Sequence, residues 1–105
     1  MNDIELMDGD GYPTEEFLSI IKNFQGTDVM YIVEMVTDNW YFGDWGYKIR
    51  KNRNGVINLE LHTGGWSGNE EIIREILGNI YLTHFKMKYV MWKTGGHYYF
   101  KINDK

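Results

Sequence analysis

The chain has 105 residues, a formal net charge of −4 and 43% hydrophobic residues, which suits one folded domain and is too short for two. The acidic charge argues against broad attraction to nucleic acid, and the lack of cysteine excludes disulfides and thiolate metal sites. With no signal peptide and no apolar run long enough to span a membrane, we expect a soluble cytoplasmic protein without a membrane partner.

Two helices are predicted in the first 40 residues. Residues 1–11 are acidic and contain glycine, and we expect them to be loosely ordered. A helix is predicted to begin at Thr14, a favourable capping residue followed by two glutamates, and to end near Gly26. In residues 28–40 the Val, Tyr and Ile content favours a strand, whereas the apolar residues also fit one helical face. We interpret this run as the second helix.

A hairpin and a third helix follow. Residues 47–51 and 56–62 resemble paired strands around an Asn54-Gly55 turn. The third helix is expected over residues 68–77. Its apolar residues at helical spacing predict a buried stripe of Ile72, Ile73, Ile76, Leu77 and Ile80.

The last quarter predicts two more strands, residues 85–93 and 97–103, joined at Thr94-Gly95-Gly96. Because side chains alternate between the faces of a strand, one face of the first is expected to carry Lys86, Lys88, Val90 and Trp92, and one face of the second His97, Tyr99 and Lys101. The predicted fold class is α+β. It is a single domain, residues 1–105, with about three helices packed on a small, mostly antiparallel sheet of about four strands.

The stretch Thr63-Gly64-Gly65-Trp66-Ser67-Gly68-Asn69-Glu70 lies between a predicted strand and the third helix. Ser67 and Glu70 have the spacing of a capping box, in which each side chain accepts a backbone N–H. Three glycines allow a tight turn and a close approach to a neighbour or a ligand. Because free N–H groups and the helix dipole converge at a helix N-terminus, such a loop can hold an anion.

This loop also carries a resemblance. The stretch from His62 to Ile73 and the later Gly95-Gly96-His97-Tyr98-Tyr99-Phe100, together with residues 12–16 and 45–47, resemble a group of small uncharacterised proteins encoded by phages and prophages. The resemblance covers most of the chain, although Lys93-Thr94 stands where the group has a basic, serine-containing turn. It implies a phage accessory protein made in the host bacterial cytoplasm, and it brings no assigned activity.

The Gly-rich loop has two interpretations, and both stay open. As a binding site it would surround a phosphate with the N–H groups of residues 67–70 and stack Trp66 on a base. As a structural loop its glycines would serve a tight turn and its tryptophan would fill the core. The carboxylates of Glu70 and Glu71 and the lack of lysine or arginine in the loop count against a phosphate, and the motif is no P-loop.

The histidines are a second candidate. His97 could act as a general base or a recognition group, or it could form a hydrogen bond across a hairpin. His62 and His97, with Glu60 or Glu70, could ligate zinc, but the spacing of known zinc motifs is absent. We therefore predict no metal and no cofactor.

Aromatic and basic residues are the remaining candidates. Four tryptophans exceed the need of one small core, which is consistent with an aromatic-lined cleft as well as with core packing. They are Trp40, Trp45, Trp66 and Trp92. Four cations in the first hairpin indicate a solvated edge strand, with contact to phosphate groups as the weaker alternative. They are Lys48, Arg50, Lys51 and Arg53.

We predict a non-enzymatic phage accessory protein with a role in counter-defence, which binds or sequesters a small anionic or nucleotide ligand at the Gly-rich loop. The predicted ligand-binding residues are Thr63, Gly64, Gly65, Trp66, Ser67, Gly68, Asn69, Glu70, His97 and Tyr98, with Trp45, His62 and Trp92 as additional candidates. The alternative is a protein–protein inhibitor of a host defence factor that uses an acidic, aromatic surface.

A second alternative is a small hydrolase that uses Ser67 and His97. A serine that caps a helix has its oxygen engaged, so we predict no catalytic residue. Nucleic acid is not expected as a partner, and a homo-oligomer stays open.

Overall fold

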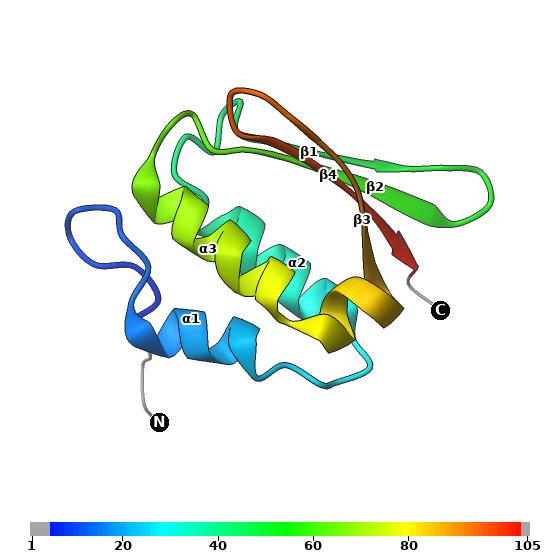
Figure 1. The fold of residues 1–105 in the computed structure, drawn as a ribbon, viewed down its shortest axis with the longest axis horizontal. Helices are drawn as coiled ribbons and strands as arrows, with labels where there is room; N and C mark the ends of the chain where they lie inside the picture. Colours follow the sequence, from blue (N-terminus) through cyan, green and yellow to red (C-terminus); the bar gives the residue numbers. More distant parts are fainter. Residues whose placement is uncertain (1–4, 104–105) are drawn as a thin grey trace.

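One antiparallel sheet organises residues 5–103, the part of the chain that the computed structural model describes. Its strands are β1 (Tyr47–Lys51), β2 (Val56–His62), β3 (Met87–Lys93) and β4 (His97–Asn103), in the order β1-β2-β4-β3. Helices α1 (Glu15–Lys22), α2 (Val29–Asp38) and α3 (Ser67–Gly78) lie on one side of the sheet, and the π-helical turn η1 (Leu82–Lys86) leads into β3 (Figure 1). The predicted single α+β domain is confirmed.

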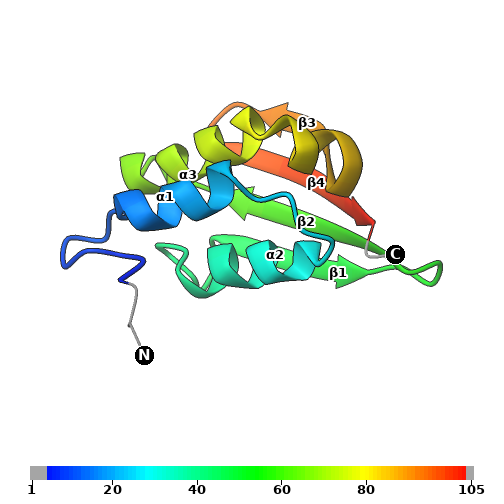
Figure 2. The same ribbon diagram turned by 90° about the horizontal axis from the view of Figure 1, so that it is seen from below.

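The helices cover one face of the sheet in two levels. Helices α2 and α3 lie next to the sheet, and α1 lies on their far side, against α3 (Figures 1 and 2). The opposite face, which carries Asn58, Glu60 and His62 of β2, is termed the outer face. No helix within residues 5–103 combines the length and the apolar character needed to cross a membrane.

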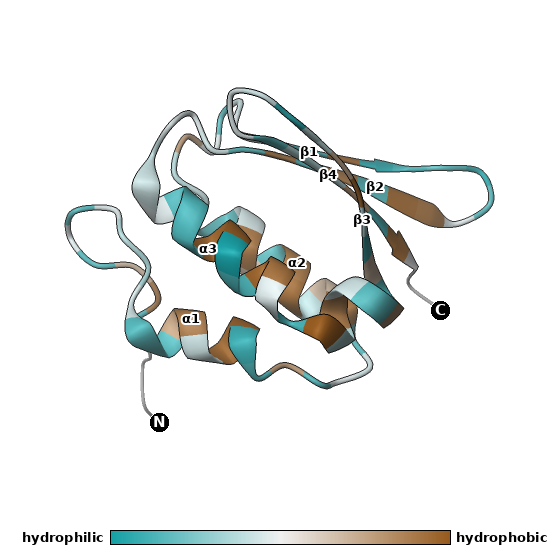
Figure 3. Ribbon diagram, in the orientation of Figure 1, coloured by the Kyte–Doolittle hydropathy of each residue, from teal (hydrophilic) through white to brown (hydrophobic). Residues whose placement is uncertain are grey.

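The alternation of β2 fixes which side of the sheet joins the core. Ile57, Leu59 and Leu61 point inward and are buried. Phe100 and Ile102 of β4 lie opposite two of them and are also buried. The helices contribute Phe17, Ile21, Val29, Ile32, Val33, Val36, Ile72, Ile73 and Ile76. Figure 3 shows hydrophobic residues on the helix sides that face one another and the sheet.

Helix α1 begins as predicted and ends earlier than predicted. The Thr14 hydroxyl accepts the N–H of Phe17 at 3.2 Å, which confirms the cap. The predicted end near Gly26 is wrong, because the helix ends at Lys22. The side-chain amide of Asn79 donates to the carbonyls of Ile21 and Phe24, at 2.8 and 3.0 Å, and so takes over carbonyls at the end of the helix.

Residues 28–40 contain a helix, as interpreted from the spacing of their apolar residues. Helix α2 runs from Val29 to Asp38 and buries Ile32, Val33 and Val36. Its β-branched residues do not prevent this, because a strand preference depends strongly on packing context. A continuous apolar helical face settles the conformation here.

Helix α3 buries most of the predicted stripe. Ile72, Ile73 and Ile76 are buried, but Ile80 is 77% exposed, which contradicts its predicted burial. The helix ends at Gly78, and Asn79 adopts φ −90° and ψ 98°, outside the helical region. The chain therefore turns before Ile80 can continue the buried stripe.

The strand predicted over residues 85–93 is shorter and bulged. It begins at Met87, because η1 occupies the preceding residues. A register shift between Tyr89 and Met91 places Met91 opposite Tyr99 and Trp92 opposite Tyr98. The extra residue exchanges the two faces of the strand. The prediction that Lys88 and Trp92 share a face is therefore wrong.

The acidic N-terminal segment is hydrogen-bonded in its described part. Of the predicted loose segment 1–11, residues 1–4 lie outside the described residues. The Asp8 carboxylate accepts the N–H groups of Asp10 and Tyr12, both at 2.9 Å, and Met7 bridges to Pro13. These bonds close a loop just before α1.

We predict that Asn79→Ala lowers the free energy of unfolding by about 1–3 kcal/mol. The substitution removes both donors to the end of α1 and leaves the buried N–H of Leu82, which bonds Asn79 Oδ1 at 3.0 Å, without that partner. Urea unfolding followed by circular dichroism measures the change. Asn23→Ala is the control, because this amide is exposed and bonds only to Ser19. Equal effects of the two substitutions would contradict the assignment.

Candidate functional site

The two glycine-containing loops meet at one end of the sheet. The N–H of Thr63 donates to the carbonyl of Gly96 at 2.9 Å, and the Thr63 side chain is fully buried. A Cβ at Gly96 would collide with Thr63 Oγ1, and the φ of Gly96 is +80°. Position 96 therefore needs glycine both for space and for its backbone conformation. This bond places the two loops next to each other.

His62 and His97 face each other beside this junction. They are register partners on β2 and β4, and their Nδ1 atoms are 2.6 Å apart. Such a bond needs a proton on one nitrogen and a lone pair on the other. Glu60 Oε1 lies 3.4 Å from His62 Nε2, which favours a proton on Nε2 and makes His97 the Nδ1 donor. Within residues 5–103 no three ligand-type side chains are grouped to hold a metal ion.

Trp66 and Ser67 are engaged by the N-terminal loop. The indole N–H of Trp66 donates to Gly11 O at 2.9 Å, and its ring packs on Tyr41 and Tyr12 with centroids 4.7 and 4.8 Å away. The Ser67 hydroxyl donates to the Tyr12 hydroxyl at 3.2 Å. These contacts give Trp66 a structural role, and they engage the Ser67 hydroxyl as a donor.

The predicted capping box is wrong. Helix α3 begins at Ser67, and Trp66 stands at the N-cap without a side-chain capping bond. The Glu70 carboxylate accepts the Thr63 hydroxyl at 3.3 Å instead of reaching the backbone of the cap. Because the serine is already inside the helix, it is one position too late to cap it. Gly68 allows this packing, since a Cβ there would lie 2.7 Å from Trp66 Nε1.

Asn69 is a buried clamp between two loops. Its amide N–H groups donate to the carbonyls of Tyr41 and Thr63 at 2.9 and 3.3 Å, and its oxygen accepts the Tyr41 N–H at 3.2 Å. The side chain is fully buried. With its donors and acceptor engaged, Asn69 holds residues 41–46 in place, and its amide is occupied by the protein itself.

Residues 41–46 form an exposed aromatic loop. Phe42 has φ +67° and is the one non-glycine residue with positive φ among residues 5–103. Its carbonyl accepts the N–H groups of Trp45 and Gly46, at 3.2 and 2.6 Å. The Phe42 and Trp45 rings stack with centroids 5.0 Å apart. They lie over Gly64, where a Cβ would come within 2.8 Å of the Phe42 ring.

A continuous series of rings crosses this end of the molecule, and it is termed the aromatic ladder. It comprises Trp45, Phe42, Tyr41, Trp66 and Tyr12, each ring in contact with the next. Trp45 is 57% exposed, and Tyr41 and Phe42 are 39% and 36% exposed. Three ladder residues are absent from the predicted site. The aromatic, glycine-containing turn was visible in the sequence, but the positive φ of Phe42 was not.

The other predicted residues do not join this surface. Tyr98 lies opposite Leu61, on the core side of the sheet, and Trp92 pairs with it. The pKa of Tyr89, on the same side, is raised above its usual value. Partial burial is the larger cause, and the neighbouring Tyr98 is the smaller one. Among the hydrogen bonds of residues 5–103, none joins Ser67 to His97, and the Ser67 hydroxyl bonds Tyr12 instead.

We predict that Asn69→Ala lowers the free energy of unfolding by about 2 kcal/mol, because it removes a buried side chain and leaves the part-buried N–H and carbonyl of Tyr41 without their Asn69 partner. Urea unfolding monitored by tryptophan fluorescence measures the loss. Asn58→Ala is the matched control, since this amide lies on the outer face and bonds the exposed Asn52. An unfolding midpoint equal to that of the control would refute the clamp.

Comparison with known proteins identifies no relative for this geometry. No protein-family model, no curated protein and no solved structure matches the chain. The resemblance to small phage proteins stays a prediction, and function is argued from the surfaces themselves.

Proposed function

We propose that this chain is a non-enzymatic binding protein that docks a partner protein through the aromatic ladder. The observation that carries the proposal is the exposure of three ladder rings, those of Tyr41, Phe42 and Trp45, on a loop whose backbone is closed by hydrogen bonds. Aromatic residues of this kind supply most of the binding energy in many protein interfaces.

The loop of residues 41–46 has the properties of a preorganised binding surface. Asn69 fixes the backbone of Tyr41, and the Phe42 carbonyl closes the turn. A left-handed conformation costs a non-glycine residue about 1–2 kcal/mol. Such strain is kept where the fold enforces it, and it is concentrated at functional sites. Rings that are already ordered lose less conformational entropy on binding.

The charge around the ladder defines the partner. The loops at this end, residues 8–14, 41–46 and 63–70, contain no lysine or arginine. They carry the carboxylates of Asp8, Asp10, Asp44 and Glu70. A complementary partner presents lysine or arginine around an apolar patch, and its cations can also stack on Trp45.

The same features count against the small anionic ligand. Carboxylates around the loop repel a phosphate, Trp66 already packs on two tyrosines, and Ser67 already bonds Tyr12. The surface therefore favours the protein-partner alternative. In the setting that the phage resemblance implies, the partner is a basic protein of the host, such as a defence factor.

Trp45→Ala tests the proposal. The ring is 57% exposed, so the fold should persist, while affinity for the partner should fall about 30-fold, as expected for a hot-spot residue worth about 2 kcal/mol. The partner is captured from bacterial lysate with the unaltered protein, identified, purified and titrated by calorimetry. Trp92→Ala is the matched control, because this tryptophan is 53% exposed and lies on β3 outside the ladder. No stoichiometric partner, or equal losses for both variants, would overturn the proposal.

A further inference from the structure

We infer that the outer face of the sheet binds single-stranded nucleic acid. This site is separate from the aromatic ladder and does not depend on the function proposed for it. It rests on the placement of five cations on three of the four strands, β1, β3 and β4, around a hollow that is lined in part by a tyrosine. The cations are Lys48, Arg50, Lys88, Lys93 and Lys101.

Strand register brings these cations to one face. Arg50 lies opposite Asn58, Asn58 opposite Lys101, and Lys101 opposite Lys88. One row across four strands thus holds three cations and an amide, and it has no carboxylate. Within residues 5–103 no salt bridge engages these cations. Directly opposed like charges destabilise a sheet. Lys88 and Lys101 are opposed in this way, and a bound anion would relieve their repulsion.

Charge is strongly segregated in this molecule. The outer face carries five of the eleven lysine and arginine residues, whereas Glu60 is the one carboxylate in the four strands. The expectation against nucleic acid came from the net charge of −4. A net charge is a sum, and it conceals a basic face when the carboxylates lie elsewhere in the chain. Local cationic surfaces, not the sum, determine where phosphates bind.

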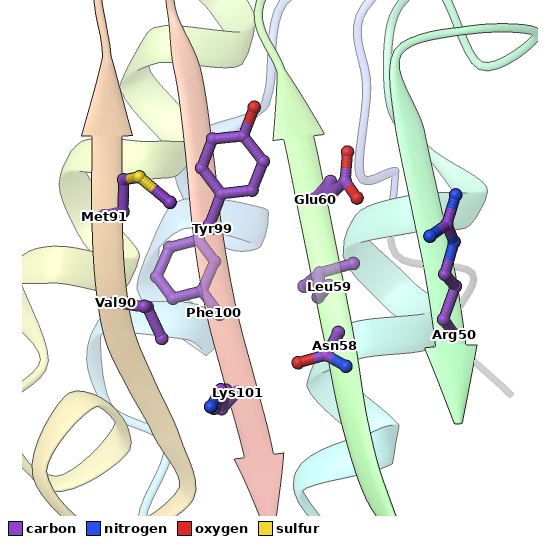
Figure 4. Close-up of a pocket in the computed structure, with 9 residues that line it drawn as sticks. All are labelled: Arg50, Asn58, Leu59, Glu60, Val90, Met91, Tyr99, Phe100 and Lys101. Carbon is purple, nitrogen blue, oxygen red and sulfur yellow. The ribbon is translucent and has the colours of Figure 1, made fainter. Parts of the chain in front are cut away.

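A hollow of about 260 Å³ lies in the middle of this face. Its polar lining includes Arg50, Asn58, Glu60 and Lys101, with Tyr99 on β4 and Met91 on the edge strand β3 beside them (Figure 4). In Figure 4 the helices lie behind the sheet, so the hollow opens on the uncovered side.

The lining suits an unpaired base between phosphates. Tyr99 offers a ring for stacking, and Lys93 Nζ lies 5.6 Å from its centroid. Asn58 and Glu60 can donate to and accept from a base edge. Stacking on aromatic rings within a cationic groove is the common mode of single-strand binding.

The shape of the face distinguishes a single strand from other anions. No helix or hairpin rises from this face to enter a duplex groove, in the part of the chain that Figures 1 and 2 describe. The cations extend over four strands, about 14 Å at the usual strand spacing, which is wider than one phosphate group. An extended single strand fits this width with its phosphates, and one of its bases fits the hollow.

Fluorescence anisotropy with a labelled oligothymidylate of about 12 nucleotides tests the inference, in the range of known site sizes. Binding should weaken about 20-fold between 50 and 200 mM salt if three phosphates are contacted. Arg50→Glu should reduce affinity about tenfold or more. Lys51→Glu is the control, because it makes the same charge change one residue away but lies opposite Ile57, on the other face.

A second variant tests the stacking ring. Tyr99→Leu keeps an apolar side chain and should lower affinity about fivefold or more, with unfolding curves showing that the fold persists. Trp45→Ala should leave oligonucleotide binding unchanged, because residues 41–46 do not line the hollow. The two proposals can therefore fail independently.

Four results would overturn the inference. The first is no binding at about 100 μM protein in low salt, the weak limit of non-specific affinity. The second is an equal loss for Arg50→Glu and Lys51→Glu. Tighter binding to phosphatidylserine vesicles would assign the face to a membrane. Self-association that Arg50→Glu abolishes would assign it to a second copy of the chain.

Discussion

Two buried asparagines fix helix α3, and the arrangement of the rest depends on where that helix lies. Asn69 in its first turn holds the backbone of Tyr41 and Thr63, and Asn79 just beyond its end holds the end of α1. A buried amide that finds partners is directional, and one that loses them is costly. Because the two clamps act at opposite ends of one rigid element, they position the aromatic loop and α1 relative to the same axis.

The sheet gives the molecule two chemically different surfaces. Its inner face is apolar and covered by helices, and its outer face carries most of the cations in the strands. At the end where β2 enters α3, the loops are acidic and aromatic instead. Opposite charges thus lie on adjacent surfaces of one small domain. Under the two proposals each surface binds a different class of partner by charge, and neither surface can be recognised from the overall composition.

Local patterns predicted the elements, while contacts between distant residues determined the site. The helical face in residues 28–40 and the alternation of β2 each depend on neighbours in sequence, and both predictions hold. The capping box failed although its spacing was right, because the Thr63 hydroxyl engages Glu70. The extra residue in β3 and the positive φ of Phe42 leave no periodic signal. Both arise from packing that only the folded chain supplies.

The strand order also identifies the two edges at which the sheet could pair with another sheet. Strands β1 and β3 are the two edges, and each has a row of backbone groups facing away from its neighbour. Exposed edges of this kind can recruit further strands and start fibres. Here β1 is short and rich in lysine and arginine, and the bulge in β3 bends the other edge. A charged edge and a bulged edge are two features that disfavour the addition of further strands to an open sheet.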